Sequence, residues 1–183
     1  MQMIQKHFIF PEDERKLFSE YGVVIFVCVE LLLHGMLIVL SICYRNNYGI
    51  YLSLFLAFLF GLLHMNNLQY RKYCLAQWSF DGDTFHVYIK DEIRTVDIGN
   101  QFCISSANLS FARRYGAVKY LFILIWEPGN SVPYEEMGAY AALKKRNVLI
   151  VPYCEDVLHI FNNQLQIKEI PLWPKSSLYY GKR

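Results

Sequence analysis

Residues 21–44 read YGVVIFVCVELLLHGMLIVLSICY, and residues 48–65 read YGIYLSLFLAFLFGLLHM. Between positions 21 and 70 the only charged side chains are Glu30 and Arg45. A helix rises about 1.5 Å per residue, so such runs are long enough to cross a hydrocarbon core of roughly 30 Å. The polar break at residues 45–47 is short, and backbone groups in lipid need internal hydrogen-bond partners. The two runs therefore predict an antiparallel transmembrane hairpin over residues 21–70.

The rest of the chain has a different character. Of the 183 residues of the whole chain, 54% are hydrophobic and 19% are charged, and nearly all the charges lie outside the hairpin. This distribution excludes a uniform soluble globule and indicates a membrane-embedded piece joined to a water-soluble one. A net charge of +2 gives no reason to expect a nucleic-acid partner. The five cysteines lack zinc-type spacing, so we expect them to be reduced and mostly buried, with no bound metal or cofactor.

Residues 1–20 form a short polar prologue. Pro11 precedes three acidic residues, which is typical of a helix start, and Leu17 and Phe18 recur with Tyr21 at helical spacing. We expect an amphipathic segment at the membrane surface.

The basic residues predict the orientation. They flank the outer ends of the hairpin, whereas its tip carries only Arg45. The positive-inside rule then places both termini in the cytoplasm of a multi-pass protein of the inner (plasma) membrane. The flanking basic residues are Lys6, Arg15, Lys16, Arg71 and Lys72.

From residue 71 the sequence predicts a cytoplasmic β domain that ends near residue 170, followed by a C-terminal tail at 171–183. Alternating hydrophobicity and an Asp-Gly turn predict a β-hairpin over residues 78–98. We expect a small curled sheet or barrel capped by a C-terminal helix, hence an α+β domain. The expected shorter elements are strands at 101–105, 109–113, 118–126 and 147–151 and helices at 134–146 and 155–165.

Residues 145–153, KRNVLIVPY, followed by the helix at 155–165, carry a family resemblance. Together with the Phe-Asp-Gly turn of the 78–98 hairpin, they resemble the bacterial YcxB-like membrane proteins. The resemblance implies a two-helix membrane hairpin followed by a pleckstrin-homology-like (PH-like) β domain. It supplies no catalytic residues. The long stretch 126–146 departs from the compact pattern and puts the local strand count in question.

Three ionisable side chains fall within the hairpin. Glu30 and His34 share a helix face, and folding the chain about its tip brings His64 opposite Glu30. Ionisable groups at membrane depth are costly unless paired, which makes them candidates for a proton relay or a metal cluster. The alternative is a hydrogen-bonded pair that only holds two helices together.

Small residues recur at every fourth position of the second run: Gly49, Ser53, Ala57 and Gly61. Such a stripe lets another helix approach closely. The partner is either the first helix of the same hairpin or the hairpin of a second chain.

Basic clusters form the third candidate site. If they face the membrane, they would contact anionic lipid headgroups, and otherwise they are solvated loop charges. These residues are Arg71, Lys72, Arg113, Arg114, Lys144, Lys145 and Arg146.

No nucleophile elbow, phosphate loop or zinc-protease motif occurs. We therefore expect a non-enzymatic, membrane-anchored binding module of regulatory or immunity type. Its partners would be membrane lipids and either a second copy of the chain or another membrane protein. One alternative is a cyclic-nucleotide-gated membrane effector of an antiviral system. Another is an intramembrane enzyme or transporter built on Glu30, His34 and His64.

Overall fold

A computed structural model describes the chain except for residues 1–6, 18–19, 114–115, 131–137 and 181–183. The chain divides into two compact units. Pro11–Cys74 forms a helical unit, and Met1–Phe10 with Leu75–Arg183 forms a β unit.

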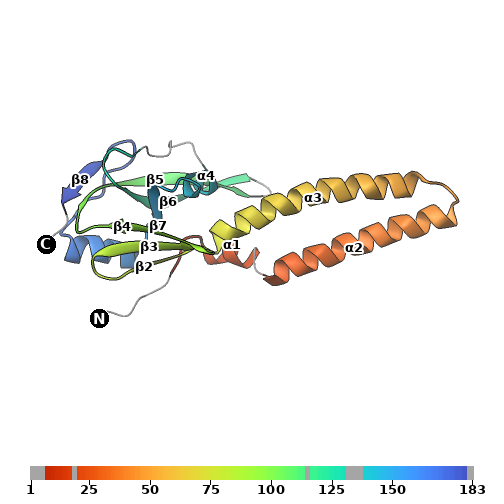
Figure 1. Ribbon diagram of the computed structural model, residues 1–183, viewed down its shortest axis with the longest axis horizontal. Helices are drawn as coiled ribbons and strands as arrows, with labels where there is room; N and C mark the ends of the chain where they lie inside the picture. Colours follow the sequence, from red (N-terminus) through yellow and green to blue (C-terminus); the bar gives the residue numbers. More distant parts are fainter. Residues whose placement is uncertain (1–6, 18–19, 114–115, 131–137, 181–183) are drawn as a thin grey trace. The chain divides into compact units, whose positions relative to one another are not determined.

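The helical unit contains α1 (Glu12–Leu17), α2 (Glu20–Cys43) and α3 (Tyr48–Cys74) (Figure 1). The tight turn between α2 and α3 has Arg45 at φ 49°, and the Asn46 amide donates to the Ser41 carbonyl. The segments Tyr21–Cys43 and Tyr48–Cys74 are both long and apolar enough to cross a membrane. This confirms the two apolar helices that the sequence predicts.

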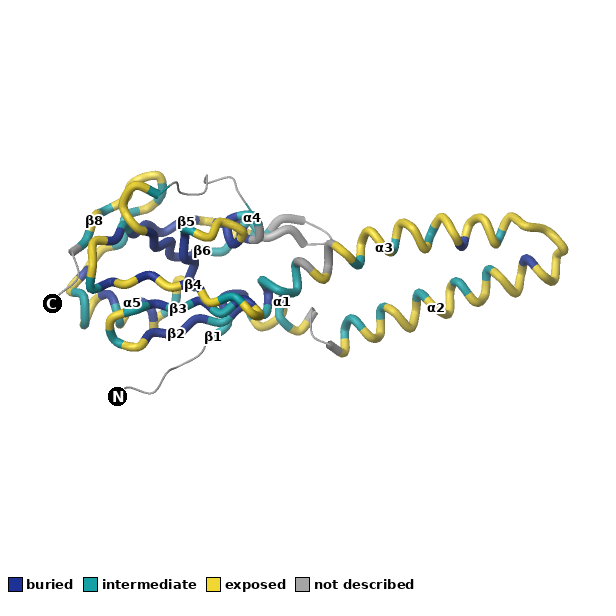
Figure 2. The backbone as a smooth tube through the Cα atoms, viewed as in Figure 1, coloured by how far each residue is buried: buried dark blue, intermediate teal, exposed yellow. Residues whose placement is uncertain are grey.

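The two long helices expose their apolar side chains over most of their surface (Figure 2). Less exposed residues recur three or four positions apart and form one seam, where α2 faces α3. The seam residues are Gly22, Val23, Phe26, Glu30, His34, Leu37 and Ser41 of α2, and Gly49, Ser53, Leu56, Phe60 and His64 of α3.

The first sheet of the β unit is antiparallel, in the order β1-β2-β3-β4. Asp81 makes the expected turn before β3, because its Oδ1 accepts hydrogen bonds from the amides of Asp83 and Thr84. The strands are β1 (His7–Phe8), β2 (Gln77–Phe80), β3 (Thr84–Ile89) and β4 (Glu92–Asp97).

The second sheet is also antiparallel, in the order β7-β6-β5-β8. The apolar strand β6 lies between two neighbours, and β7 lies close to β3 and β4 of the first sheet. The strands are β5 (Gln101–Arg113), β6 (Gly116–Trp126), β7 (Val148–Pro152) and β8 (Ser177–Tyr180).

Helical segments complete the β unit: α4 (Ala139–Leu143), α5 (Glu155–His159) and a π-helical continuation, η1 (Ile160–Gln164). The α5–η1 segment is amphipathic and buries Val157 and Phe161. The Phe161 ring stacks on Phe85 of β3, with the ring centroids 5.4 Å apart. The predicted C-terminal helix is therefore present, and it packs on the aromatic side of the first sheet.

The β unit differs from its prediction in five places. The described residues form two four-stranded sheets and no closed barrel. The two short strands expected at 101–113 are one strand, β5. The expected tail at 171–183 contains β8, which pairs with β5, and the expected surface prologue contains β1, which pairs with β2. Of the helix expected at 134–146, the structure has α4, and residues 134–137 lie outside the described part.

Candidate functional site

The seam between α2 and α3 brings Glu30, His34 and His64 together. His64 Nε2 lies 2.5 Å from Glu30 Oε2, and His34 Nε2 lies 3.8 Å from Glu30 Oε1. The side chains of Glu30 and His34 are each 15% exposed and that of His64 is 25% exposed. One carboxylate therefore faces two imidazoles, one from each helix.

A fourth polar residue, Ser53, belongs to the cluster. Its hydroxyl lies 2.8 Å from His34 Nδ1, and Ser53 is only 8% exposed. The His34 Nε2 atom is buried and has no hydrogen-bond partner. When Ser53 donates to Nδ1, His34 carries its proton on Nε2 and points it toward Glu30. The serine was predicted only as a small residue for helix packing.

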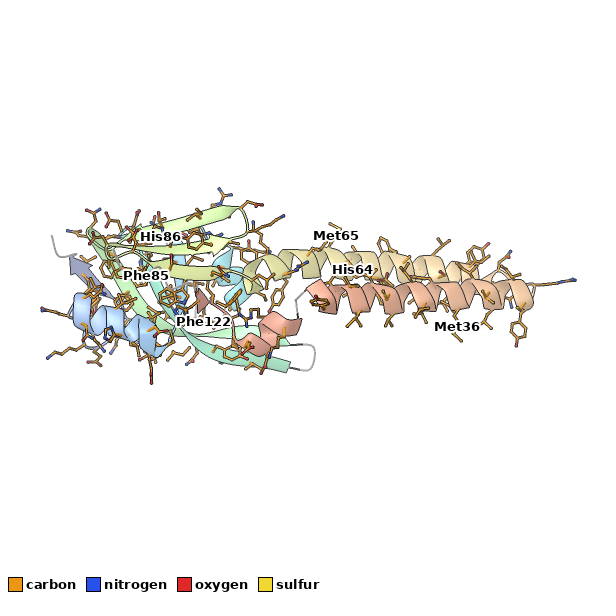
Figure 3. The ribbon with its side chains drawn as sticks, turned by 90° about the horizontal axis from the view of Figure 1, so that it is seen from below. Met36, His64, Met65, Phe85, His86 and Phe122 are labelled. Atoms are coloured by element: carbon orange, nitrogen blue, oxygen red, sulfur yellow. The ribbon has the colours of Figure 1, made fainter. Side chains whose placement is uncertain are left out.

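Aromatic rings enclose the cluster. The Phe26 ring lies edge-on to His64 and to Phe60, and Phe60 lies edge-on to His34. The exposed side chains of Met36 and Met65 project away from the hairpin in Figure 3. The polar groups thus lie in an apolar environment, where charge–charge and hydrogen-bond energies are large.

The geometry suits a shared proton better than a metal ion. A separation of 2.5 Å between His64 Nε2 and Glu30 Oε2 leaves no room for an ion between the two atoms, since each metal–ligand bond is about 2 Å long. Among the described residues, no group of three His, Cys, Asp or Glu side chains could hold a metal ion.

The stripe of small residues on α3 divides into two parts. Gly49 and Ser53 face α2, and a Cβ added at Gly49 would meet Ser41 Oγ and lie 2.6 Å from the Leu37 carbonyl oxygen. Ala57 and Gly61 are exposed, and nothing lies within 4 Å of a Cβ added at Gly61. A step of four residues turns about 40° beyond a full helical turn, so the stripe leaves the seam after Ser53.

The predicted basic residues fall into separate places. Arg71 and Lys72 occupy the last turn of α3 and are half-buried. Lys144, Lys145 and Arg146 are exposed together in the turn between α4 and β7, which we call the basic turn (residues 144–146). Arg113 belongs to β5 with its side chain outside the described part, and Arg114 lies outside it altogether.

Arg94 supports the basic turn, a role that was not predicted from the sequence. Its residue is only 7% exposed on β4, and its Nη1 donates to the carbonyls of Leu143 and Lys145, the latter at 3.0 Å. Its Nε donates to Glu92 Oε1 at 2.9 Å, and Arg146 lies 3.7 Å from the same oxygen. The alternating pattern of the strand could predict that Arg94 is buried. Only the fold brings the carbonyls of Leu143 and Lys145 close to its side chain.

The cysteines give no activated nucleophile. All five are free, and only Cys74 is buried, whereas Cys28 and Cys43 are exposed on the long helices. The expectation that most are buried was therefore wrong. Burial raises the pKa of the Cys154 thiol, which favours the unreactive protonated form.

Comparison with protein-family models, with curated proteins and with solved structures finds no match in any of the three. The similarity to YcxB-like proteins therefore rests on the sequence of residues 78–98 and 145–165, and it stays a prediction.

Proposed function

We propose that the chain is a non-enzymatic integral protein of the inner (plasma) membrane, in which a transmembrane hairpin holds a binding module at the cytoplasmic face. The observation that carries this proposal is the exposure of the two apolar helices. None of the apolar window of Tyr21–Cys43 is buried, and only 6% of that of Tyr48–Cys74 is buried. Soluble proteins rarely expose so large an apolar surface, whereas lipid chains would cover it.

The proposed orientation places both termini in the cytoplasm. Arg71 and Lys72 lie in the last turn of α3, and Arg15 and Lys16 lie in the last turn of α1, which precedes α2 in the chain. The tip carries Arg45 alone. This distribution favours a cytoplasmic open end.

The proposed binding module is the β unit, with a PH-like role in contacting a lipid or protein partner. Only two residues separate the end of α3 from the start of β2, so the β unit stays close to the bilayer surface. The basic turn offers three exposed cations in consecutive positions. Each basic residue near an anionic leaflet contributes about 1 kcal/mol, which supports anionic lipid as the first partner. Regulatory or immunity-type action is the wider class that we infer for such a module.

The hairpin is also the proposed surface for self-association. Ala57 and Gly61 are turned away from α2, which leaves two small residues one turn apart for the helix of a second chain.

Alkaline carbonate extraction, followed by protease treatment of sealed inverted membranes and of intact cells, tests the anchoring. We expect the full chain to stay in the membrane pellet and the β unit to be cleaved only in inverted membranes. Release of intact chain by carbonate, or cleavage of the β unit from outside intact cells, would overturn the proposal.

A further inference from the structure

We propose that Glu30, His34 and His64 form a proton-binding site inside the hairpin, in which one proton is shared between Glu30 and His64 and has a second position between Glu30 and His34. The inference rests on the membrane location proposed for the hairpin and is independent of what the β unit binds.

The cluster lies close to the middle of the proposed membrane span. Leu32 is the midpoint of the span Tyr21–Cys43, and Glu30 and His34 each lie two residues from it, about 3 Å along the helix axis. A net charge at this depth is expensive. An ionised carboxylate together with two neutral imidazoles carries one negative charge. The group becomes electrically neutral when it binds one further proton.

Among the described seam residues, no other charged side chain near the cluster can neutralise the Glu30 carboxylate. Two elements pack around the cluster, α2 and α3. Among their described seam residues, the titratable side chains near the cluster are Glu30, His34 and His64 themselves. Tyr70 and Arg71 follow His64 by six and seven residues, and Arg45 lies at the opposite end of the hairpin, at the tip.

The distance between Glu30 and His64 allows them to share this proton. At 2.5 Å, Glu30 Oε2 and His64 Nε2 are close enough to share it. Moving it breaks the carboxyl O–H bond and forms an N–H bond on His64, so a neutral acid and base become a carboxylate and an imidazolium with no change in total charge.

The second position uses the other carboxyl oxygen. Glu30 Oε1 and the buried His34 Nε2 are 3.8 Å apart, so an approach of about 1 Å would give an ordinary hydrogen bond. In this position the ring's own proton lies on Nδ1 and is donated to the Ser53 hydroxyl, 2.8 Å away, which leaves Nε2 free to accept. Toward the tip, the next described seam residue of α2 is Leu37. On the tip side, the described part of the cluster therefore ends at His34 and Ser53, because the apolar Leu37 follows.

Insertion of the hairpin into the membrane should be coupled to the uptake of a proton. In water near neutral pH a free glutamate is ionised and free histidines are mostly neutral, so the three groups carry one negative charge. The inserted hairpin would therefore take up one proton from water and hold it.

Solid-state ¹⁵N NMR of the full, histidine-labelled chain in lipid bilayers tests the site. We expect His64 Nε2 to give the signal of a nitrogen that shares a proton with a carboxylate, unchanged at pH values on either side of about 6.5, where a free imidazole titrates. The exposed His159 lies outside the hairpin and is the internal control for the histidine signals. If the His64 signal changes across this pH range as that of a free imidazole does, the proposal is wrong.

Two variants sharpen the result. Glu30→Gln should convert His64 to an ordinary neutral imidazole, and an unchanged His64 signal would contradict the shared proton. Ser53→Ala removes no titratable group and should shift the His34 tautomer while leaving the His64 signal in place. Carbonate extraction of the same samples reports insertion, so failure of the anchor and failure of the proton site are distinguishable, and the pH series on the unaltered chain needs no variant to fold.

Discussion

At the scale of single residues, Arg94 has the clearest structural role in the β unit. Replacing it by Ala removes three hydrogen bonds and leaves the Leu143 and Lys145 carbonyls without this donor. We expect the free energy of unfolding of the β unit to fall by about 2–4 kcal/mol. Arg94→Lys should recover only part of the lost free energy of unfolding, because an ammonium lacks the planar fork of donors.

Thermal unfolding of the full chain in bilayers, followed by tryptophan fluorescence, measures this loss. Lys90→Ala is the matched control, since the Lys90 side chain is 71% exposed and the change should cost under about 0.5 kcal/mol. Equal midpoints for Arg94→Ala and Lys90→Ala would show that the buried guanidinium does not hold the turn.

The Asp81–His86 pair gives a pH-dependent contribution to stability. His86 Nε2 donates to Asp81 Oδ2 at 2.9 Å, and this hydrogen bond lowers the pKa of Asp81. A lowered carboxyl pKa stabilises the fold above the ordinary value of about 3.9, and the gain disappears as the pH falls through the lowered value. Because the Asp81 side chain is 47% exposed, we expect less than about 1 kcal/mol.

Asp81→Asn keeps the Oδ1 acceptor of the turn and removes the carboxylate. Hydrogen exchange of the β2–β3 hairpin across the acid range should show a smaller loss of protection in the variant than in the unaltered chain. Identical acid dependence in both chains would rule out the pair as its source.

At the scale of elements, the two glycines of α3 separate packing within the hairpin from packing between chains. Gly49→Ala places a Cβ 2.6 Å from the Leu37 carbonyl, so α2 and α3 must move apart at a cost of about 1–3 kcal/mol. A Cβ added at Gly61 meets nothing within 4 Å, so Gly61→Leu should leave the hairpin intact. It should instead weaken self-association by roughly tenfold, because it fills the groove for a second helix.

Spin labels on Ile38 and Leu52, which are both exposed, report the distance between the helices, and energy transfer between differently labelled chains in bilayers reports self-association. The expected pattern is a broadened distance for Gly49→Ala only and lower energy transfer for Gly61→Leu. Unchanged energy transfer in Gly61→Leu would remove this face as an interface between chains.

The sequence predicted the long elements best. Apolar runs and the Asp-Gly turn are local signals, and the structure contains the two long helices and the β2–β3 hairpin at those positions. The prediction divided strand β5 by leaving residues 106–108 out of both expected strands. In the fold, the Ser105 hydroxyl lies 2.9 Å from the Lys175 carbonyl oxygen, and the Ser106 amide donates to Pro171. These partners are distant in sequence, so no local pattern could reveal them.

The candidate site shows the same division. Helical spacing and the hairpin tip sufficed to expect Glu30, His34 and His64 near one another, because position along two antiparallel helices is a matter of counting. The hydrogen bond of Ser53 to His34 depends on helix rotation, which a stripe of small residues does not determine. Arg94 was missed because its partners are backbone carbonyls, which every sequence contains.

At the scale of the whole molecule, the proposed function predicts that the basic turn responds to lipid charge. Hydrogen exchange at residues 144–147 of the full chain should be slower in bilayers with anionic lipid than in zwitterionic bilayers, and the difference should shrink with added salt. Replacing Lys144, Lys145 and Arg146 by Gln should abolish the difference, while Lys168→Gln, at an exposed position elsewhere, should not. Equal exchange in both bilayers would remove the turn from the lipid contact.

The central claim is that the hairpin crosses a membrane with both open ends on the cytoplasmic side. Single cysteines in an otherwise cysteine-free chain test it most directly, at Asn47 in the tip and at Asn162 in the β unit, both exposed. Asn47 is preferable to Asn46, whose Oδ1 accepts the Tyr48 amide at the start of α3. With a membrane-impermeant maleimide on intact cells, we predict labelling of N47C and no labelling of N162C until the cells are opened. Labelling of N162C in intact cells would contradict the claim. So would a failure to label N47C in intact cells.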